Sequence, residues 1–461
     1  MQFKLLPLEI QSDDPFRFDG LERRASVEAV ASLLDTLSGP FVLAIDSPWG
    51  TGKTTFVRLL KAFLESRNFF CLYFNAWETD FTTDPLIAFL GEMDKLVKAH
   101  NHKGKVLDKT KKIATLLAKR VLPVAGKIAT GGLLDLGSFT EKALAELVSD
   151  SVNDAVDAYS AEKSLIENFH KSLSEAVEKL KADEKKSNLV VFVDEVDRCR
   201  PTFAIELLER IKHLFNVPNI LFVISLDKVQ LAVSLAAIYG AGINSDEYLR
   251  RFIDLEYVLP KANPKAFTRH LFARFGFEDF FAARTHDAFR YERDQLEQSF
   301  SSLSDLFGLS LRAREQCFTM LRVAMITTPD DHYFYPFFLS TLIVLKVAAP
   351  STYKKYALEN GTATDLVNTI RQLNGGEIFL NSRIGITIEA NLVGARPRSH
   401  NEPPEIEHYN KVSKDASKTD EERQRADQVI KIVTDASFYD KMPSLAYVVN
   451  KIELAAQFRT D

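Results

Sequence analysis

Four short runs of almost continuous apolar residues divide the first half of the chain. They are FVLAID (41–46), FFCLYFN (69–75), LVVFVD (189–194) and ILFVIS (220–225). A strand that is covered by helices on both faces has this pattern, so the runs predict a buried, parallel central sheet. Segments starting at Lys53 and Thr202 repeat apolar residues every three or four positions, which predicts helices after the first and third strands. The alternation between residues 41 and 226 therefore predicts an α/β fold.

The first predicted strand runs into SPWGTGKTT and then into a helix, the local context of a phosphate-binding P-loop. Gly50 and Gly52 let backbone amides turn inward, Lys53 can reach the terminal phosphates, and Thr54 can bind Mg²⁺. The usual motif has glycine five residues before Gly52, where this chain has Ser47. We expect nucleotide contacts from Ser47, Pro48, Trp49, Gly50, Thr51, Gly52, Lys53, Thr54 and Thr55.

The third predicted strand ends in two acids, Asp194 and Glu195. Parallel strands deliver their carboxyl ends to one sheet edge, so Asp194 is expected to hold Mg²⁺ through water. Glu195 is then placed to orient or deprotonate the attacking water. The alternative is that these acids only cap the following helix, and both roles are open for Asp197.

Further side chains are candidates for sensing the γ-phosphate. The fourth strand ends at Ser225 and Asp227, where a polar group can position water, although a structural cap is nearly as well supported for Ser225. Arg250 and Arg251 in YLRRFID, and Arg312 in LSLRAR, can stabilise transition-state charge in their own or a neighbouring subunit. Ordinary ion pairs are the alternative for each arginine.

An insertion separates the second and third predicted strands, since over a hundred residues exceed a simple crossover. Its segment 103–127 contains eight Lys or Arg residues and one acid, Asp108. Four apolar residues of this segment share one helical face: Ile113, Leu117, Val121 and Val124. The segment is either an ordinary amphipathic helix with its lysines in water or a docking element for DNA or an anionic membrane surface.

The remaining chain is predicted to be mostly helical, with a Phe-rich start after Asn263. The polar, proline-containing residues 396–428 indicate a linker or loop. The predicted organisation is an N-terminal part of the P-loop domain (1–100), a helical insertion (101–185), a C-terminal part of the P-loop domain (186–262), a helical lid or C-terminal domain (263–395), the linker or loop (396–428) and C-terminal helices (429–461).

Composition narrows the function classes. The formal net charge of -5 gives no global attraction for nucleic acid, and the three cysteines are too far apart for a disulfide framework or zinc ribbon. The N-terminus lacks the long apolar region of a signal peptide, so a cytoplasmic location is expected, with peripheral membrane association as an option. His100 and His102 have no carboxylates at ligand spacing, which favours solvated loop residues over a metal site.

Several sequence features together resemble the KAP P-loop NTPases. They are DPFRFDGLERR, WGTGKTTF, FNAWE at 74–78, VVFVDEVDRC, ISLD and YLRRFID, and they span residues 13–260. The chain departs from the family pattern at Ser47 and at Glu195, where a second aspartate is frequent. Such proteins commonly insert transmembrane helices, but Lys119, Arg120 and Lys127 interrupt the corresponding stretch, so the resemblance does not carry a membrane span here.

ATP is the preferred nucleotide, because the NKxD sequence used for guanine is lacking and NKIE at 450–453 lies in the C-terminal tail. A strand between the P-loop strand and the magnesium-acid strand points to the branch that includes AAA and STAND ATPases. The resemblance implies a Mg²⁺-dependent ATPase that switches a partner effector in bacterial phage exclusion or signalling, as a homo-oligomer or hetero-complex. The alternative is a nucleotide-stabilised binding module on DNA, membrane or protein, with little turnover.

Overall fold

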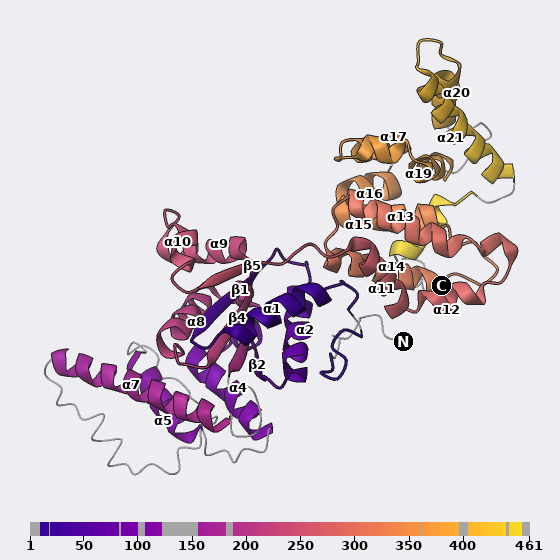
Figure 1. Cartoon of the computed structure of the whole chain (residues 1–461). Coiled ribbons are helices and arrows are strands. Elements are labelled where there is room, and N and C mark those ends of the chain that lie inside the picture. The colour runs from indigo at the N-terminus through magenta and orange to yellow at the C-terminus, as the bar shows by residue number, and fades with distance from the viewer. Residues whose placement is uncertain are drawn as a thin grey trace, which may run out of the picture. The chain divides into compact units, whose positions relative to one another are not determined.

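The computed structural model describes residues 10–17, 19–82, 84–99, 107–121, 155–180, 188–359, 361–395, 404–438 and 442–453. The chain forms two units, coloured from indigo to magenta and from red to yellow in Figure 1. The P-loop unit contains Arg23–Pro260 and the segment ending at Asp19. The helical unit contains Gly20–Glu22 and the chain from Lys261. Each unit is described by itself.

The P-loop unit is built on a five-stranded parallel sheet in the order β2-β3-β4-β1-β5. The strands are β1 (Phe41–Asp46), β2 (Phe70–Asn75), β3 (Leu189–Asp194), β4 (Ile220–Leu226) and β5 (Leu255–Val258). Strand β4 lies between the P-loop strand β1 and the acid-bearing strand β3, as the sequence predicts. The predicted P-loop NTPase fold is therefore confirmed.

Alternate residues of each strand enter two different cores, because successive side chains point to opposite faces of a sheet. Leu43, Ile45, Val190 and Phe192 pack on one face with helices α1 (Arg24–Thr36) and α2 (Lys53–Ser66). Their neighbours in sequence, such as Val191 and Val193, pack on the other face with the helices that follow β2, β3 and β4. These are α3 (Ala76–Thr79), α4 (Pro85–Ala99), α8 (Pro201–Leu214), α9 (Lys228–Tyr239) and α10 (Ser245–Leu249).

The strand β5 was not predicted from the sequence. Its four residues, LEYV, include a glutamate, and all but Tyr257 are exposed, so they lack the continuous apolar run of a central strand. An edge strand needs burial on fewer sides, and β5 is joined to β1 alone. The apolar pattern that reveals buried strands therefore misses it.

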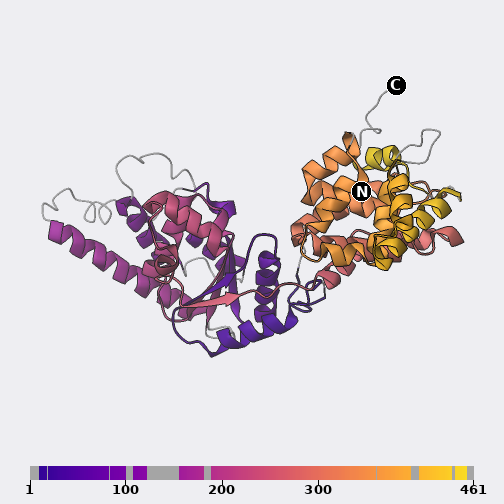
Figure 2. The same cartoon turned by 90° about the horizontal axis from the view of Figure 1, so that it is seen from above.

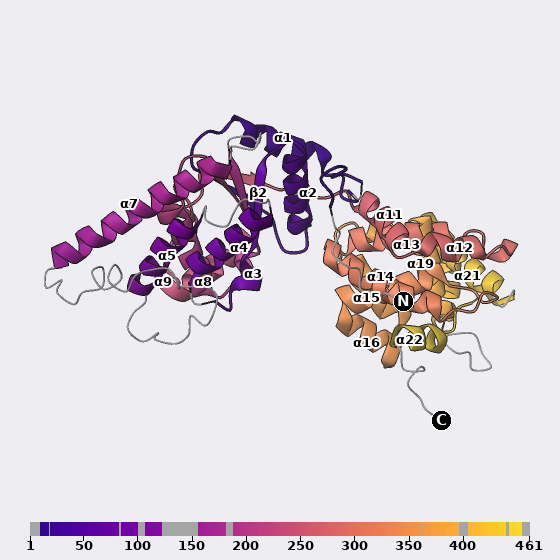
Figure 3. The same cartoon turned by 90° about the horizontal axis from the view of Figure 1, so that it is seen from below.

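The insertion is helical in its described residues, as predicted. It contains α5 (Asp108–Val121) and the long α7 (Ala155–Leu180), which lie beside each other in Figure 3. Leu117 is buried in the main core of this unit, and Ile113 packs against that core. Leu117 therefore packs on the protein and is unavailable to a membrane interface. Residues 103–106 and 122–127 of the predicted docking element, and His100 and His102, lie outside the described residues.

Two lysines of α5 pair with acids of the same unit. Lys111 contacts Asp94 of α4, and Lys109 lies 3.6 Å from Glu175 of α7. The two charges on Lys109 and Glu175 are both well exposed, so their pairing adds little stability. This part of the basic segment behaves as an amphipathic helix whose apolar face is packed.

All regular elements among the described residues after Pro260 are helices, as Figure 2 shows for the orange and yellow parts of the chain. They are α11 (Pro264–Arg274), α12 (Phe277–Ala283), a 3-10 turn (Asp287–Phe289), α13 (Glu292–Leu306), α14 (Leu311–Ile326), α15 (Pro336–Ala348), α16 (Pro350–Leu358), α17 (Ala363–Arg371), α18 (Gly376–Leu380), α19 (Arg383–Gly394), α20 (Pro404–Lys414), α21 (Asp420–Phe438) and α22 (Leu445–Glu453). The predicted Phe-rich region supplies Phe272, Phe275 and Phe277, whose rings pack around Phe318.

The linker or loop predicted for residues 396–428 is wrong where the structure describes it. Residues 404–414 form α20, and 420–428 belong to α21, which packs against α20 and α19. Polar composition hid these helices, because only a few residues of each are buried, among them Ile406, Tyr409 and Val429. Among the described residues, no helix is long and apolar enough to cross a membrane.

The packing of α5 gives a stability prediction. Leu117→Ala should lower the free energy of unfolding of the P-loop unit by about 2–4 kcal/mol, because it leaves a cavity in a closed core. Lys109→Ala, on the exposed side of the same helix, should change it by no more than about 0.5 kcal/mol. Urea unfolding followed by circular dichroism measures both. Equal stability of the two variants would show that α5 is not packed on the core.

Candidate active site

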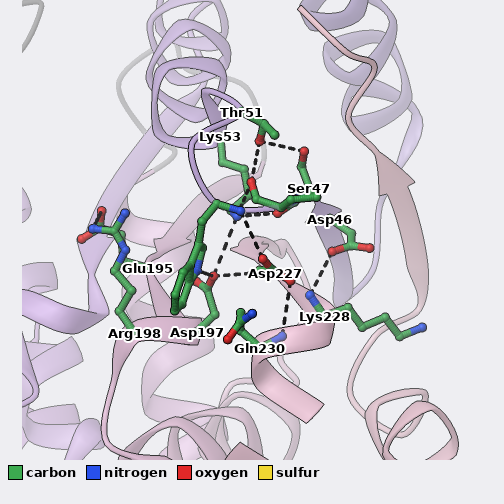
Figure 4. A network of polar contacts seen from close by, with 12 residues as sticks. Asp46, Ser47, Thr51, Lys53, Glu195, Asp197, Arg198, Asp227, Lys228 and Gln230 are labelled. Carbon is green, nitrogen blue, oxygen red and sulfur yellow. Dashed lines mark hydrogen bonds and ion pairs between the residues drawn. The ribbon is translucent and has the colours of Figure 1, made fainter. Parts of the chain in front are cut away.

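The candidate site lies at the carboxyl edge of the sheet, where β1, β3 and β4 end. Figure 4 shows Asp197, after β3, and Asp227, after β4, beside the P-loop that follows β1. Ile45 pairs in register with Ser225, and Asn75 at the end of β2 pairs with Asp194. The strands therefore end at nearly the same level, which brings together residues that are up to 182 positions apart in sequence.

The P-loop connects β1 to α2 through two glycines in left-handed conformations. Gly50 has φ 75° and Gly52 has φ 91°, values that favour glycine because a Cβ would be strained there. Gly52 also forms the N-cap of α2. Lys53, Thr54 and Thr55 follow as the first turn, where free amides and the helix dipole favour an anion.

Ser47 takes the place of the usual first glycine of the motif without backbone strain, since its φ is not positive. Its hydroxyl donates to Thr51 Oγ1 at 2.7 Å, and Thr51 Oγ1 donates to the Pro48 carbonyl at 2.7 Å. The Ser47 amide donates to the Leu226 carbonyl at the end of β4. The serine therefore braces the loop internally and anchors it to the sheet.

Arg23 is a buried residue that the sequence indicated only as part of the family resemblance. Its guanidinium donates to the Thr51 carbonyl at 3.3 Å and to the Pro260 carbonyl. Burial lowers the pKa of Arg23, and Asp19 opposes this shift. Arg23 thus joins the P-loop to the chain segment that leaves β5.

The Lys53 ammonium points back toward the loop. It donates to the Ser47 carbonyl and, at 3.4 Å, to the Pro48 carbonyl. It also forms an ion pair with Asp197 Oδ2 at 3.8 Å, with side-chain exposures of 9% and 2%. The P-loop lysine and the turn after β3 are therefore in direct electrostatic contact.

Asp194 is the last residue of β3 and is 1% exposed. Its Oδ2 accepts a hydrogen bond from the Tyr73 hydroxyl at 2.8 Å, and its Oδ1 accepts from the Glu195 amide at 2.9 Å. Burial, followed by the Asp194 charge, raises the pKa of Tyr73, so the hydroxyl keeps the proton that it donates. Both carboxylate oxygens of the predicted magnesium acid are thus held in place by protein donors.

Glu195 follows Asp194 in a left-handed conformation with φ 62°, which is unusual for a residue with a Cβ. The Arg198 guanidinium lies 2.8 Å from its carboxylate, and the Asn75 amide donates to it at 3.5 Å. Burial raises the pKa of Glu195, while the Arg198 charge opposes the shift. Strained non-glycine backbone often occurs at functional sites, and here it directs the glutamate toward Asn75 and Arg198.

Asn75 is a site residue whose individual role was missed in the sequence. Its side-chain oxygen caps α3 by accepting from the Trp77 and Glu78 amides. Its nitrogen is then left to face Glu195. The signal for such a role is a polar residue at the end of a buried strand, and Asn75 follows the apolar run that ends at Phe74.

Asp197 belongs to the 3-10 turn Val196–Arg198 and connects three segments. Its Oδ2 accepts from the Trp49 indole at 2.5 Å and from the Asp227 amide at 3.0 Å, and it pairs with Lys53. Burial raises the pKa of Asp197, and the Lys53 charge counteracts that shift. The sequence left its role open between helix capping and phosphate chemistry, and its contacts lead to the P-loop.

The two residues predicted at the end of β4 differ in their contacts. Ser225 is fully buried, and its hydroxyl has no hydrogen-bond partner among the described residues. Asp227 caps α9 by accepting from the Val229 and Gln230 amides, and its other oxygen accepts from the Trp49 amide at 3.1 Å. The cap role considered for Ser225 is thus filled by Asp227, and a γ-phosphate role for Ser225 stays a prediction.

The two candidate arginines belong to different units, Arg251 to the P-loop unit and Arg312 to the helical unit. Arg251 is exposed, stacks 5.5 Å from the Tyr248 ring and precedes β5. The nearby Asp254 amide bonds to Val42 near the start of β1, so Arg251 lies toward the amino edge of the sheet, opposite the P-loop. Arg312 is exposed in the first turn of α14 in the helical unit. Both roles stay predictions.

The sheet order, the glycine loop at a helix N-terminus and the acids at the end of β3 define a P-loop nucleoside triphosphate-binding protein. A model of the KAP family P-loop domain matches residues 23–315, which is more than half of the chain. The chain therefore belongs to the KAP family of P-loop proteins.

Solved structures of low similarity were also found. The Aeropyrum pernix ORC2 protein in its ADP form matches with a TM-score of 0.36 and 14% identity, covering 99% of this chain and 98% of that chain. Its ADPNP-ADP complexes match with a TM-score of 0.35 and 15% identity, covering 95% and 97%. A DNA replication initiation factor matches with a TM-score of 0.25 and 11% identity, covering 75% and 88%. These scores carry no argument about function, and no curated protein matches the chain.

The Tyr73–Asp194 hydrogen bond gives a prediction for the site. Tyr73→Phe should lower the free energy of unfolding of the P-loop unit by about 1–2 kcal/mol, because a buried carboxylate oxygen loses its donor. Tyr239→Phe, which removes an exposed hydroxyl of α9, should change it by no more than about 0.5 kcal/mol. Denaturant unfolding compares the two. An unchanged stability of Tyr73→Phe would contradict the assigned hydrogen bond.

Proposed function

We propose that this protein is a Mg²⁺-dependent ATPase whose catalytic groups are Lys53, Thr54, Asp194 and Glu195. The observation that carries the proposal is the direct contact of Lys53 with the turn that follows β3. This contact joins the phosphate loop to the segment that bears both acids. Phosphoryl transfer needs such an arrangement, because its catalysis is mostly positioning and charge stabilisation.

The oxygen-rich donor set suits magnesium. The hydroxyl of Thr54, in the first turn of α2, is a hard oxygen ligand of the kind that Mg²⁺ prefers, and the carboxylate of Asp194 at the end of β3 would hold the ion through water. Among the described residues, no group of three or more His, Cys, Asp or Glu residues can hold a metal by itself. Mg²⁺ typically binds through one or two protein groups together with substrate phosphates and water, and this site fits that mode. The bound ion would neutralise phosphate charge.

Glu195 supports hydrolysis rather than binding alone. Asn75 and Arg198 hold its carboxylate in place. Burial raises the pKa of Glu195, which makes the carboxylate a stronger base toward a proton from water. The alternative function, a nucleotide-stabilised binding module, would need neither this acid nor its orientation. ATP is preferred to GTP because no NKxD sequence follows the P-loop strands.

The biological role follows from family membership as a further proposal. ATP binding and hydrolysis would switch the conformation or assembly of the chain and so control a partner effector, in bacterial phage exclusion or signalling. A homo-oligomer or a complex with the effector would transmit the switch. Docking of residues 103–127 on DNA or anionic lipid remains a secondary proposal, restricted to its charged face because Leu117 is packed in the core.

Two substitutions test the proposed reaction. Lys53→Ala should abolish ATP binding, because the lysine contacts phosphate before the reaction. Glu195→Gln should bind ATP within about threefold of wild type but lower turnover by about a hundredfold or more, because the glutamate acts on water. Calorimetric ATP titration and steady-state phosphate release measure the two effects. Equal loss of ATP affinity in both variants would show that the water-directing acid is misassigned, and wild-type binding without turnover would favour the binding module.

A second test concerns the arginines. At least one of Arg251→Ala and Arg312→Ala should lower ATP turnover by about a hundredfold, because the guanidinium offsets transition-state charge. Arg269→Ala, an exposed arginine of α11, is the matched control and should stay within about twofold. If both candidate variants also stay within that range, the catalytic role is wrong for both.

Because Arg251 lies opposite the P-loop of its own chain, mixing two inactive variants can test whether it acts on a neighbouring subunit. If Arg251 acts on a neighbouring subunit, mixing the inactive Lys53→Ala and Arg251→Ala proteins should restore part of the turnover. The Lys53→Ala subunit then supplies the arginine to a site with an intact lysine. Mixing Lys53→Ala with Glu195→Gln is the control. Each of its sites lacks either the lysine or the glutamate, so turnover should not be restored.

A further inference from the structure

Asp197 Oδ2 is a point where three parts of the P-loop unit meet. The Trp49 indole comes from the P-loop, the Asp227 amide from the start of α9, and the Lys53 ammonium from α2. The carboxylate is buried, so its charge is poorly screened by water. It therefore acts on Lys53 more strongly than a surface acid at the same distance would.

Among the described residues, three oxygens contact the Lys53 ammonium. Two are the Ser47 and Pro48 carbonyls, and the third is Asp197. The ammonium donates hydrogen bonds to the two carbonyls and meets the Asp197 carboxylate as an ion pair, beyond hydrogen-bond distance. A phosphate that engages Lys53 must compete with these oxygens, and Asp197 is the charged competitor.

We propose that Asp197 is a positioning residue whose charge restrains Lys53 and so weakens ATP binding, while its hydrogen bonds to Trp49 and Asp227 hold the P-loop in shape. The proposal rests on the proposed ATP binding. Two effects of the charge act in the same direction. The carboxylate attracts the ammonium away from the phosphates, and it repels the phosphates themselves. The hydrogen bonds to Trp49 and Asp227 need an acceptor oxygen but no charge.

An asparagine at position 197 separates the effect of the charge on Lys53 from the effect of the hydrogen bonds to Trp49 and Asp227. Asp197→Asn keeps an oxygen that can accept from the Trp49 indole and the Asp227 amide, but it removes the charge beside Lys53. Freeing the lysine raises the fraction of protein that is competent to bind, so ATP should bind about three- to tenfold more tightly. Asp197→Ala removes the acceptor as well, and the loop should lose one of its anchors, the bond to the Trp49 indole. ATP should then bind more weakly than in wild type.

The experiment is a calorimetric titration of the full chain with ATP and Mg²⁺. Asp246→Asn is the matched control, because it removes an exposed carboxylate that pairs with Lys228, and its ATP affinity should be unchanged. Weaker or unchanged binding in Asp197→Asn, with wild type binding ATP, overturns the restraint. A wild type that does not bind ATP overturns the proposed function instead.

The two tryptophans of the chain provide a measurement that does not depend on the folding of Asp197→Asn. Trp77→Phe leaves Trp49 as the single tryptophan, and its indole contacts the carboxylate that Lys53 would leave. Saturating ATP should therefore shift the emission of Trp49 in this variant, both because Trp49 belongs to the P-loop and because Lys53 leaves the carboxylate that the indole contacts. An unchanged Trp49 emission, in a Trp77→Phe protein that binds ATP by calorimetry, contradicts the proposal.

Discussion

The parallel register of β1, β3 and β4 is the constraint on which the site depends. Since these strands run in one direction and end at one level, the P-loop, the acids after β3 and the cap of α9 meet at one edge. Such a sheet needs helices on both faces, and the two cores supply them. Side chains at the edge can then be charged or strained without opening the interior, because the buried strands already fix their positions.

A short turn after β3 places the three acids of the DEVD sequence in different environments. Asp194 ends the strand and is held by Tyr73, whereas the left-handed backbone of Glu195 turns the next carboxylate toward Asn75 and Arg198. Asp197, after one further residue, points back to Lys53 and Trp49. Three carboxylates within four positions therefore avoid direct contact, and each meets its own donors.

The sequence predicts structure best where a local backbone conformation or the burial of a segment requires one type of residue. Gly50 and Gly52 reveal a loop with positive φ, and apolar runs reveal strands that are buried on both faces. It was least informative where the demand comes from elsewhere in the fold. The edge strand β5 needs only β1 as a neighbour, and α20 and α21 bury few residues, so neither shows a strong apolar pattern. The partners of Asn75 and Asp197 are set by the register of strands that are far apart in sequence.

The serine at position 47 illustrates how a motif can change while its physical requirement is kept. The phosphate loop must be closed and rigid, and glycine at this position is not needed for that, because Ser47 has no positive φ. Its hydroxyl instead begins a chain through Thr51 to the Pro48 carbonyl, while Arg23 and Asp227 hold the loop from outside through Thr51 and Trp49. The rigidity of the loop thus comes from side chains on several elements, and a change in any of these elements can reach the phosphate site.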